Sequence, residues 1–171
     1  MSQRLLALFY AVLALIAPQT SGAVETGAKM PDCELTSIKG AQRYQLQQFH
    51  GKVLYVDFWA SWCPPCARSF PFLNDLDRDL KDRGLQVIGI NMDQIPEDTK
   101  GFLDKYPASF TVAADVHEKC AKDFDVKAMP SSYLVDRNGV IRHVHLGFRP
   151  DEAKELRVLA EQLLTETSGQ K

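Results

Sequence analysis

The sequence predicts an α/β fold with a central mixed sheet flanked by helices. Two apolar runs, one starting at Val53 and one over residues 85–91, have the length and side-chain types of buried strands. Between them leucines recur at helical spacing, and a strand, a helix and a second strand in that order are typical of neighbouring parallel strands. Further on, Asn138-Gly139 separates two strand-like runs and predicts an antiparallel hairpin. Parallel and antiparallel pairs together make the sheet mixed.

The first residues differ in composition from the rest of the chain. Arg4 precedes an uninterrupted apolar run over residues 5–17, and residues 21–23 are small. This pattern is typical of a signal peptide, so we predict one over residues 1–23, with an uncleaved membrane anchor as the alternative. The apolar run is shorter than the roughly 20 residues that a membrane span needs. Export would place the mature chain in the periplasm, which is an oxidising compartment.

Length and composition predict one domain without repeats. A chain of 171 residues can bury one sizeable core. We expect a flexible leader over residues 24–30, the domain over 31–167 and a disordered tail over 168–171. The net charge of -2 does not indicate a surface for nucleic acid, and we expect a monomer.

Turn and breaker residues divide the domain into elements of alternating type. Gly84 is expected to end the first long helix, and Pro71 to kink it. In chain order we expect two short extended pieces around Gly40, a strand from 53, a helix to about 83, a strand over 85–91, a helix over 96–106, a strand over 110–113, a short helix over 118–124, a hairpin over 130–147 and an amphipathic helix over 151–167.

Two cysteines, Cys63 and Cys66, lie where the first predicted strand gives way to the helix, with Pro64 and Pro65 between them. A cysteine at a helix start lies beside free backbone N–H groups and the positive end of the macrodipole, which favour the thiolate and lower the thiol pKa. Pro65 suits the first helical turn, where a missing N–H costs nothing. We therefore predict that Cys63 attacks a disulfide and that Cys66 resolves the mixed disulfide. Structural cysteines or half of a zinc site are the alternatives.

The segment from Asp57 to Cys66, with Trp59, Ala60 and Trp62 before the cysteine pair, resembles the active-site segment of thioredoxins. Together with the downstream blocks it is similar to the TlpA/ResA group of exported bacterial thioredoxin-like proteins, over roughly residues 31–164. The resemblance implies a thioredoxin fold with an added N-terminal hairpin and a central insert before the short helix over 118–124. It also implies a thiol:disulfide oxidoreductase that needs no metal or organic cofactor.

The resemblance implies roles for residues outside the pair. Pro130 matches a proline that is cis in the family and faces the cysteines, where the Met129 backbone can pair with an extended substrate peptide. Asp57 matches a buried aspartate that can take the proton from Cys66, although many TlpA-like chains carry Asn there. The predicted substrate-binding residues are Trp62, Pro64, Pro65, Met129 and Pro130.

The other two cysteines, Cys33 and Cys120, remain if Cys63 pairs with Cys66. They could form a structural disulfide between the N-terminal hairpin and the short helix, and two free buried cysteines are the alternative.

His143 and His145 alternate onto one strand face, which indicates a solvated or half-buried face. No metal site is predicted.

The direction of electron flow is predicted from the motif. No histidine lies between the cysteines, whereas strongly oxidising relatives tend to have one, so we expect a reductase of disulfides in exported proteins. A membrane thiol donor of the DsbD/CcdA type would supply its electrons. Apocytochrome c is one candidate substrate, although residues 67–69 lack the glutamate of some cytochrome c maturation reductases.

Three other functions compete with this prediction. A disulfide oxidase or isomerase uses the same fold and the same cysteine pair. A peroxide reductase is disfavoured because its Thr or Ser upstream of a single peroxidatic cysteine is absent. A non-catalytic binding module is disfavoured because both active-site cysteines are present.

Overall fold

The computed structural model describes residues 24–166. The predicted signal peptide over 1–23 and the predicted tail over 168–171 lie outside the described residues. In chain order the helices and strands are β1 (Glu34–Ser37), β2 (Arg43–Gln45), β3 (Val53–Trp59), α1 (Pro64–Leu80), β4 (Leu85–Asn91), α2 (Pro96–Lys105), β5 (Thr111–Ala114), α3 (Lys119–Asp123), β6 (Ser131–Val135), β7 (Ile141–Leu146) and α4 (Ala153–Thr165). None of the helices in this part of the chain is long and apolar enough to cross a membrane.

The strands form one sheet in the order β2-β1-β5-β4-β3-β6-β7. Strand β3 is parallel to β4 and antiparallel to β6, and β4 is parallel to β5. The mixed sheet confirms the predicted α/β class. Strand β5, from the predicted central insert, pairs with β4 on one side and with β1 of the N-terminal hairpin on the other. The insert therefore connects that hairpin to the central strands.

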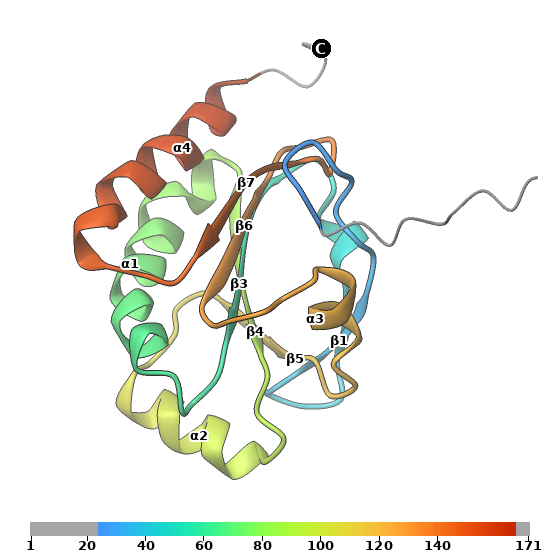
Figure 1. The fold of residues 1–171 in the computed structure, drawn as a ribbon, viewed down its shortest axis with the longest axis vertical. Coiled ribbons are helices and arrows are strands. Elements are labelled where there is room, and N and C mark those ends of the chain that lie inside the picture. The colour runs from blue at the N-terminus through green and yellow to red at the C-terminus, as the bar shows by residue number, and fades with distance from the viewer. Residues whose placement is uncertain (1–23, 167–171) are drawn as a thin grey trace, which may run out of the picture.

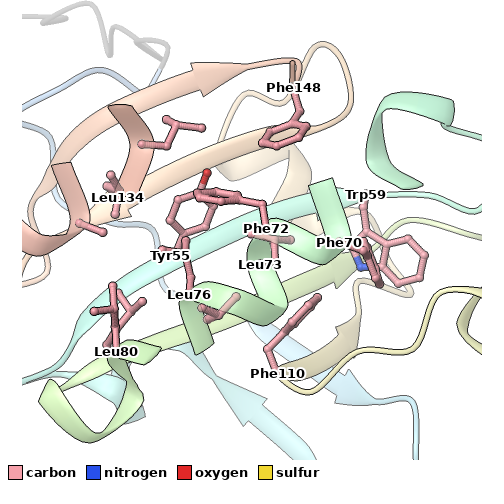
Figure 2. Packing of buried hydrophobic residues seen from close by; sticks show 14 of the residues in the cluster. Tyr55, Trp59, Phe70, Phe72, Leu73, Leu76, Leu80, Phe110, Leu134 and Phe148 are labelled. Carbon is pink, nitrogen blue, oxygen red and sulfur yellow. The ribbon is translucent and has the colours of Figure 1, made fainter. Parts of the chain in front are cut away.

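Helices cover both faces of this sheet, with α1 and α4 on one side and α3 on the other (Figure 1). Because side chains alternate along a strand, β3 contributes to two apolar layers. Tyr55 and Trp59 lie in the layer under α1 and α4, together with Leu73 and Leu76 of α1 (Figure 2). Phe58 lies in the opposite layer, under α3. Burial on both faces accounts for the continuous apolar character of β3.

Residues 24–30, the predicted flexible leader, pair with the hairpin of β6 and β7. The Gly27 N–H donates to the Ile141 carbonyl at 2.7 Å and the Met30 N–H to the Gly139 carbonyl at 2.8 Å. The Ile141 N–H donates to the Ala28 carbonyl at 2.9 Å. This pairing needs a partner strand far along the chain, which local composition does not reveal.

Two helix boundaries differ slightly from those predicted from the sequence. The first long helix is α-helical to Leu80 and continues as a 3₁₀ turn over Lys81–Arg83, and Gly84 then adopts the left-handed conformation with φ 101°. The last helix is preceded by a 3₁₀ turn over Pro150–Glu152, so its α-helical part starts at Ala153. Both ends are short 3₁₀ turns, which are frequent at helix termini.

Candidate active site

The cysteine pair lies at the junction of β3 and α1, where the sequence analysis expected it. Cys63 is the residue that caps α1, with an extended backbone at φ -101°, and its sulfur accepts a hydrogen bond from the Cys66 N–H at 3.3 Å. Pro64 and Pro65 occupy the first helical positions, where they leave no N–H unpaired. The two cysteines are joined as a disulfide with a Cα–Cα distance of 5.3 Å. The structure therefore holds the oxidised state of the pair.

Exposure differs sharply among the residues around the pair. Cys63 is 4% exposed and Cys66 is fully buried, whereas the neighbouring Trp62 is 69% exposed. Trp59 is fully buried and packs on Phe70, with 4.9 Å between ring centroids. Trp62 is thus a large exposed apolar side chain directly beside Cys63 in the chain, while Trp59 belongs to the core.

A hollow of about 370 Å³ adjoins Cys63. One wall is Trp62 and Pro64, and the opposite wall is Phe102, Lys105 and Tyr106, which belong to α2 and the residue after it. The central insert therefore forms one side of the surface around the cysteine pair.

Asp57 of β3 is buried, with an exposed fraction of 1%. Its Oδ1 accepts a hydrogen bond from the Ser132 hydroxyl at 2.5 Å, and its Oδ2 has no partner among the described residues. Burial raises the pKa of Asp57 from 3.8 to about 7, although the Ser132 hydrogen bond acts in the opposite direction. Burial and the nearby Asp57 charge also raise the pKa of Tyr55. A carboxyl group with this pKa can gain or lose a proton near neutral pH.

Ser132 was not identified from the sequence as a site residue. It lies directly opposite Asp57 in the antiparallel pairing of β6 with β3. An alternation of polar residues within the hairpin could have indicated it only once the strand register was known. Ser132 follows Pro130 by two residues, so one short segment provides both the hydroxyl and the predicted substrate-binding backbone.

Pro130 and Met129 lie beside the same layer as the cysteines. The Met129–Pro130 peptide bond is cis, and the Pro130 carbonyl accepts a hydrogen bond from the Gly147 N–H at 2.8 Å. Pro130 is buried, and the half-buried Met129 packs against the apolar cluster that contains Cys63 and Cys66. The structure thus brings these two predicted residues to the side of the sheet that carries the pair.

Cys33 and Cys120 are joined in a second disulfide, with a Cα–Cα distance of 5.4 Å. Both are buried in the layer under α3, whereas Cys63 and Cys66 lie in the layer under α1 and α4. The two disulfides therefore lie in different apolar layers, on opposite faces of the sheet.

The predicted histidine face lies on β7. The ring centroids of His143 and His145 are 6.2 Å apart, and His145 Nε2 lies 3.2 Å from Glu152 Oε2. Burial and the neighbouring His145 lower the pKa of His143. Within residues 24–166 no three His, Cys, Asp or Glu side chains are grouped so that they could hold a metal ion.

Comparison with known proteins places this geometry in a family. Residues 25–163 match the family described as Redoxin. The thiol-disulfide oxidoreductase ResA of Bacillus thuringiensis subsp. konkukian is 30% identical over 118 residues, which cover 69% of this chain and 68% of the relative. ResA of Geobacillus kaustophilus is 28% identical over 125 residues, which cover 73% of this chain and 71% of the relative.

A solved structure agrees with these relatives. The crystal structure of a candidate thiol:disulfide interchange protein DsbE from Chlorobium tepidum is 39% identical, with a TM-score of 0.79 over 83% of this chain and 99% of that chain. The fold, the cysteine pair and the relatives agree on one chemistry. This chain therefore belongs to the Redoxin family, as a TlpA/ResA-like thiol-disulfide oxidoreductase with the thioredoxin fold.

Proposed function

We propose that this chain is an exported reductase that breaks disulfides in other periplasmic proteins through Cys63 and Cys66. The observation that carries the proposal is the placement of Cys63 at the start of α1, with its sulfur accepting the Cys66 N–H and the exposed Trp62 beside it. A helix start favours a thiolate, and an exposed aromatic side chain offers a surface to a polypeptide substrate.

The proposed reaction is dithiol–disulfide exchange in two steps. The Cys63 thiolate attacks one sulfur of the substrate disulfide, which forms a mixed disulfide and releases the other substrate sulfur as a thiolate that takes up a proton. The Cys66 thiol then gives its proton to Asp57 and attacks the Cys63 sulfur. This step forms the Cys63–Cys66 disulfide and releases the second substrate sulfur as a thiolate, which takes up the second proton. The substrate thus gains two electrons and two protons, and a membrane thiol donor of the DsbD/CcdA type would restore two electrons and two protons to the cysteine pair.

Two features of the site support reduction over oxidation. The residues between the cysteines are prolines, so they offer neither a side-chain cation nor an N–H to stabilise a thiolate further. Asp57 is buried, and because side chains alternate along a strand it lies on the same face of β3 as Tyr55 and Trp59. That face carries the apolar layer that contains the cysteine pair, so the ionised form of Asp57 would oppose a thiolate there. Moderate stabilisation of the thiolate corresponds to a reducing potential.

The potential tests the proposal directly. We expect a value of roughly -220 to -280 mV, on the scale where thioredoxin lies near -270 mV and DsbA near -120 mV. The measurement is equilibration against a glutathione buffer series, followed by the fluorescence of Trp59 and Trp62. A value above about -160 mV would make the protein an oxidant and contradict the proposed direction.

The roles of the two cysteines have a separate test. Because Cys63 caps the helix and Cys66 is fully buried, iodoacetamide at mildly acidic pH should label Cys63 of the reduced protein well before Cys66. Peptide mapping by mass spectrometry reads the order of labelling. Equal or reversed labelling would contradict the assignment of Cys63 as the nucleophile.

Substrate identity and export need the native compartment. A Cys66→Ser variant should retain its substrates as mixed disulfides on Cys63, and mass spectrometry of the trapped species would identify them. Apocytochrome c would appear among them if the chain serves cytochrome c maturation.

The intact mass of the periplasmic protein should correspond to a chain that begins at Val24, and an unprocessed mass would favour the anchored alternative.

A further inference from the structure

The loop that presents Cys63 is held by a side chain from outside the cysteine motif. Asp93 lies two residues beyond the end of β4, and its Oδ1 accepts hydrogen bonds from the Ser61 N–H and the Ser61 hydroxyl, both at 3.0 Å. Ser61 precedes Cys63 by two residues, and the Cys63 N–H closes the turn on the Ala60 carbonyl at 3.2 Å. The carboxylate of Asp93 thus holds the middle of the segment between β3 and the nucleophile.

The other oxygen of the same carboxylate contacts the end of β4 and the central insert. Asp93 Oδ2 accepts a hydrogen bond from Asn91 Nδ2 at 2.8 Å. It also lies 3.0 Å from the Thr99 hydroxyl, whose single proton is shared with Asn91 Oδ1 at 2.8 Å. The Asp93 N–H donates in turn to Asn91 Oδ1 at 3.1 Å. Asn91 and Thr99 are buried, with exposed fractions of 1% and 6%. Because Thr99 belongs to α2, one carboxylate joins β4, the insert helix and the loop before Cys63.

We propose that Asp93 is a positioning residue for the cysteine pair, which acts by fixing Ser61 and thereby Cys63. The proposal rests on the dithiol exchange proposed above. Cys66 is already fixed inside α1, so the entropy lost when the disulfide closes depends on how freely Cys63 moves in the reduced state. A loop held by Asp93 loses less freedom on closure, which raises the effective molarity of the two thiols.

Removing the carboxylate has a defined consequence for the redox equilibrium. With Asp93→Ala the reduced loop gains freedom, so closure of the disulfide becomes less favourable and the protein becomes more oxidising. We expect the equilibrium constant for disulfide formation against glutathione to fall about tenfold, which corresponds to a potential about 30 mV less negative.

Asp93→Asn is the matched variant. It keeps a carbonyl oxygen that can accept the Ser61 N–H, and we expect it to restore most of the wild-type potential. Both substitutions remove the same negative charge, so a difference between them reports on the hydrogen-bond acceptor and not on the charge. Equal shifts in the two variants would overturn the proposal.

A residue that merely stabilises the fold gives a different result. It would lower the free energy of unfolding of the oxidised and reduced forms equally, and the potential would then stay unchanged, because the potential reports the difference between the two forms. Unfolding of both forms is therefore measured beside the potential. Asp104→Ala removes an exposed carboxylate from α2 and should leave the potential unchanged. An unchanged potential in Asp93→Ala, or the same shift in Asp104→Ala, would overturn the proposal.

Thr99→Val provides a second route if Asp93→Ala does not fold. It removes a hydroxyl that contacts both Asp93 Oδ2 and Asn91 Oδ1, which loosens the anchor of the carboxylate. The potential should shift in the same direction by a smaller factor, and no shift would contradict the proposal. The wild-type potential reports separately on the proposed function. An oxidising wild-type value would contradict the reductase, whereas the differences among variants would still decide the role of Asp93.

Discussion

Replacing Cys33 and Cys120 together by alanine is expected to lower the free energy of unfolding by about 4 to 5 kcal/mol. The two residues are 87 positions apart, so their disulfide closes a long loop and removes much of the conformational freedom of the unfolded chain. Folded domains are stable by only about 5–15 kcal/mol, so the change is a large fraction of the total. Urea unfolding of the oxidised proteins measures it.

The second cysteine pair supplies the control for this experiment. Cys63→Ala with Cys66→Ala removes a disulfide between residues only 3 positions apart, for which loop closure predicts a much smaller loss. The Cys33→Ala/Cys120→Ala protein should also keep the wild-type redox potential, because its cysteines lie in the layer under α3. Equal losses of stability in the two double variants would contradict a structural role for the Cys33–Cys120 bridge.

The part of the site that depends on neighbours in the chain was predictable from the sequence. The apolar run of β3 specifies a buried strand, and the prolines after Cys63 suit the first turn of a helix, so the helix start at Cys63 follows from local rules. The N-terminal hairpin and the insert were implied by resemblance to a family. Their place in the sheet, with β5 between β1 and β4, confirms that expectation.

The part that depends on distant pairing was not predictable. Ser132 reaches Asp57 across 75 residues and Asp93 reaches Ser61 across 32, and neither pair has a local pattern that indicates the contact. Each contact requires the strand register or the path of the insert, which side-chain packing decides. The pairing of the leader with β7 has the same cause. The long-range polar contacts are therefore the part of this site that the structure reveals and the sequence does not predict.

Asp57→Asn is expected to stabilise the oxidised protein above neutral pH. Burial raises the pKa of Asp57 from 3.8 to about 7, so between these values the folded chain holds a proton that the unfolded chain has lost. Stability contributed by this group is therefore complete below about pH 4 and is lost as the pH rises through about 7. Three pKa units correspond to about 4 kcal/mol, as an order of magnitude. Urea unfolding from about pH 3 to pH 9 measures the free energy of unfolding of both proteins. The variant should become more stable relative to the wild type as the pH rises from about 4 to about 7, and a pH-independent difference would contradict the raised pKa.

The same substitution is expected to slow catalysis. If Asp57 takes the proton of Cys66, asparagine leaves that thiol without an acceptor, and general base catalysis of this kind contributes about 10²- to 10⁴-fold. Resolution of a mixed disulfide on Cys63 should slow by a factor in that range, while its formation stays nearly unchanged. In the wild type the resolution rate should rise through about pH 7 as the carboxyl ionises. Stopped-flow release of a thiol substrate measures both steps, and an unaltered resolution rate from about pH 6 to pH 9 would rule out the relay. A variant that is more stable and yet slower cannot owe its lost activity to a damaged fold, so the two measurements together assign the proton transfer to Asp57.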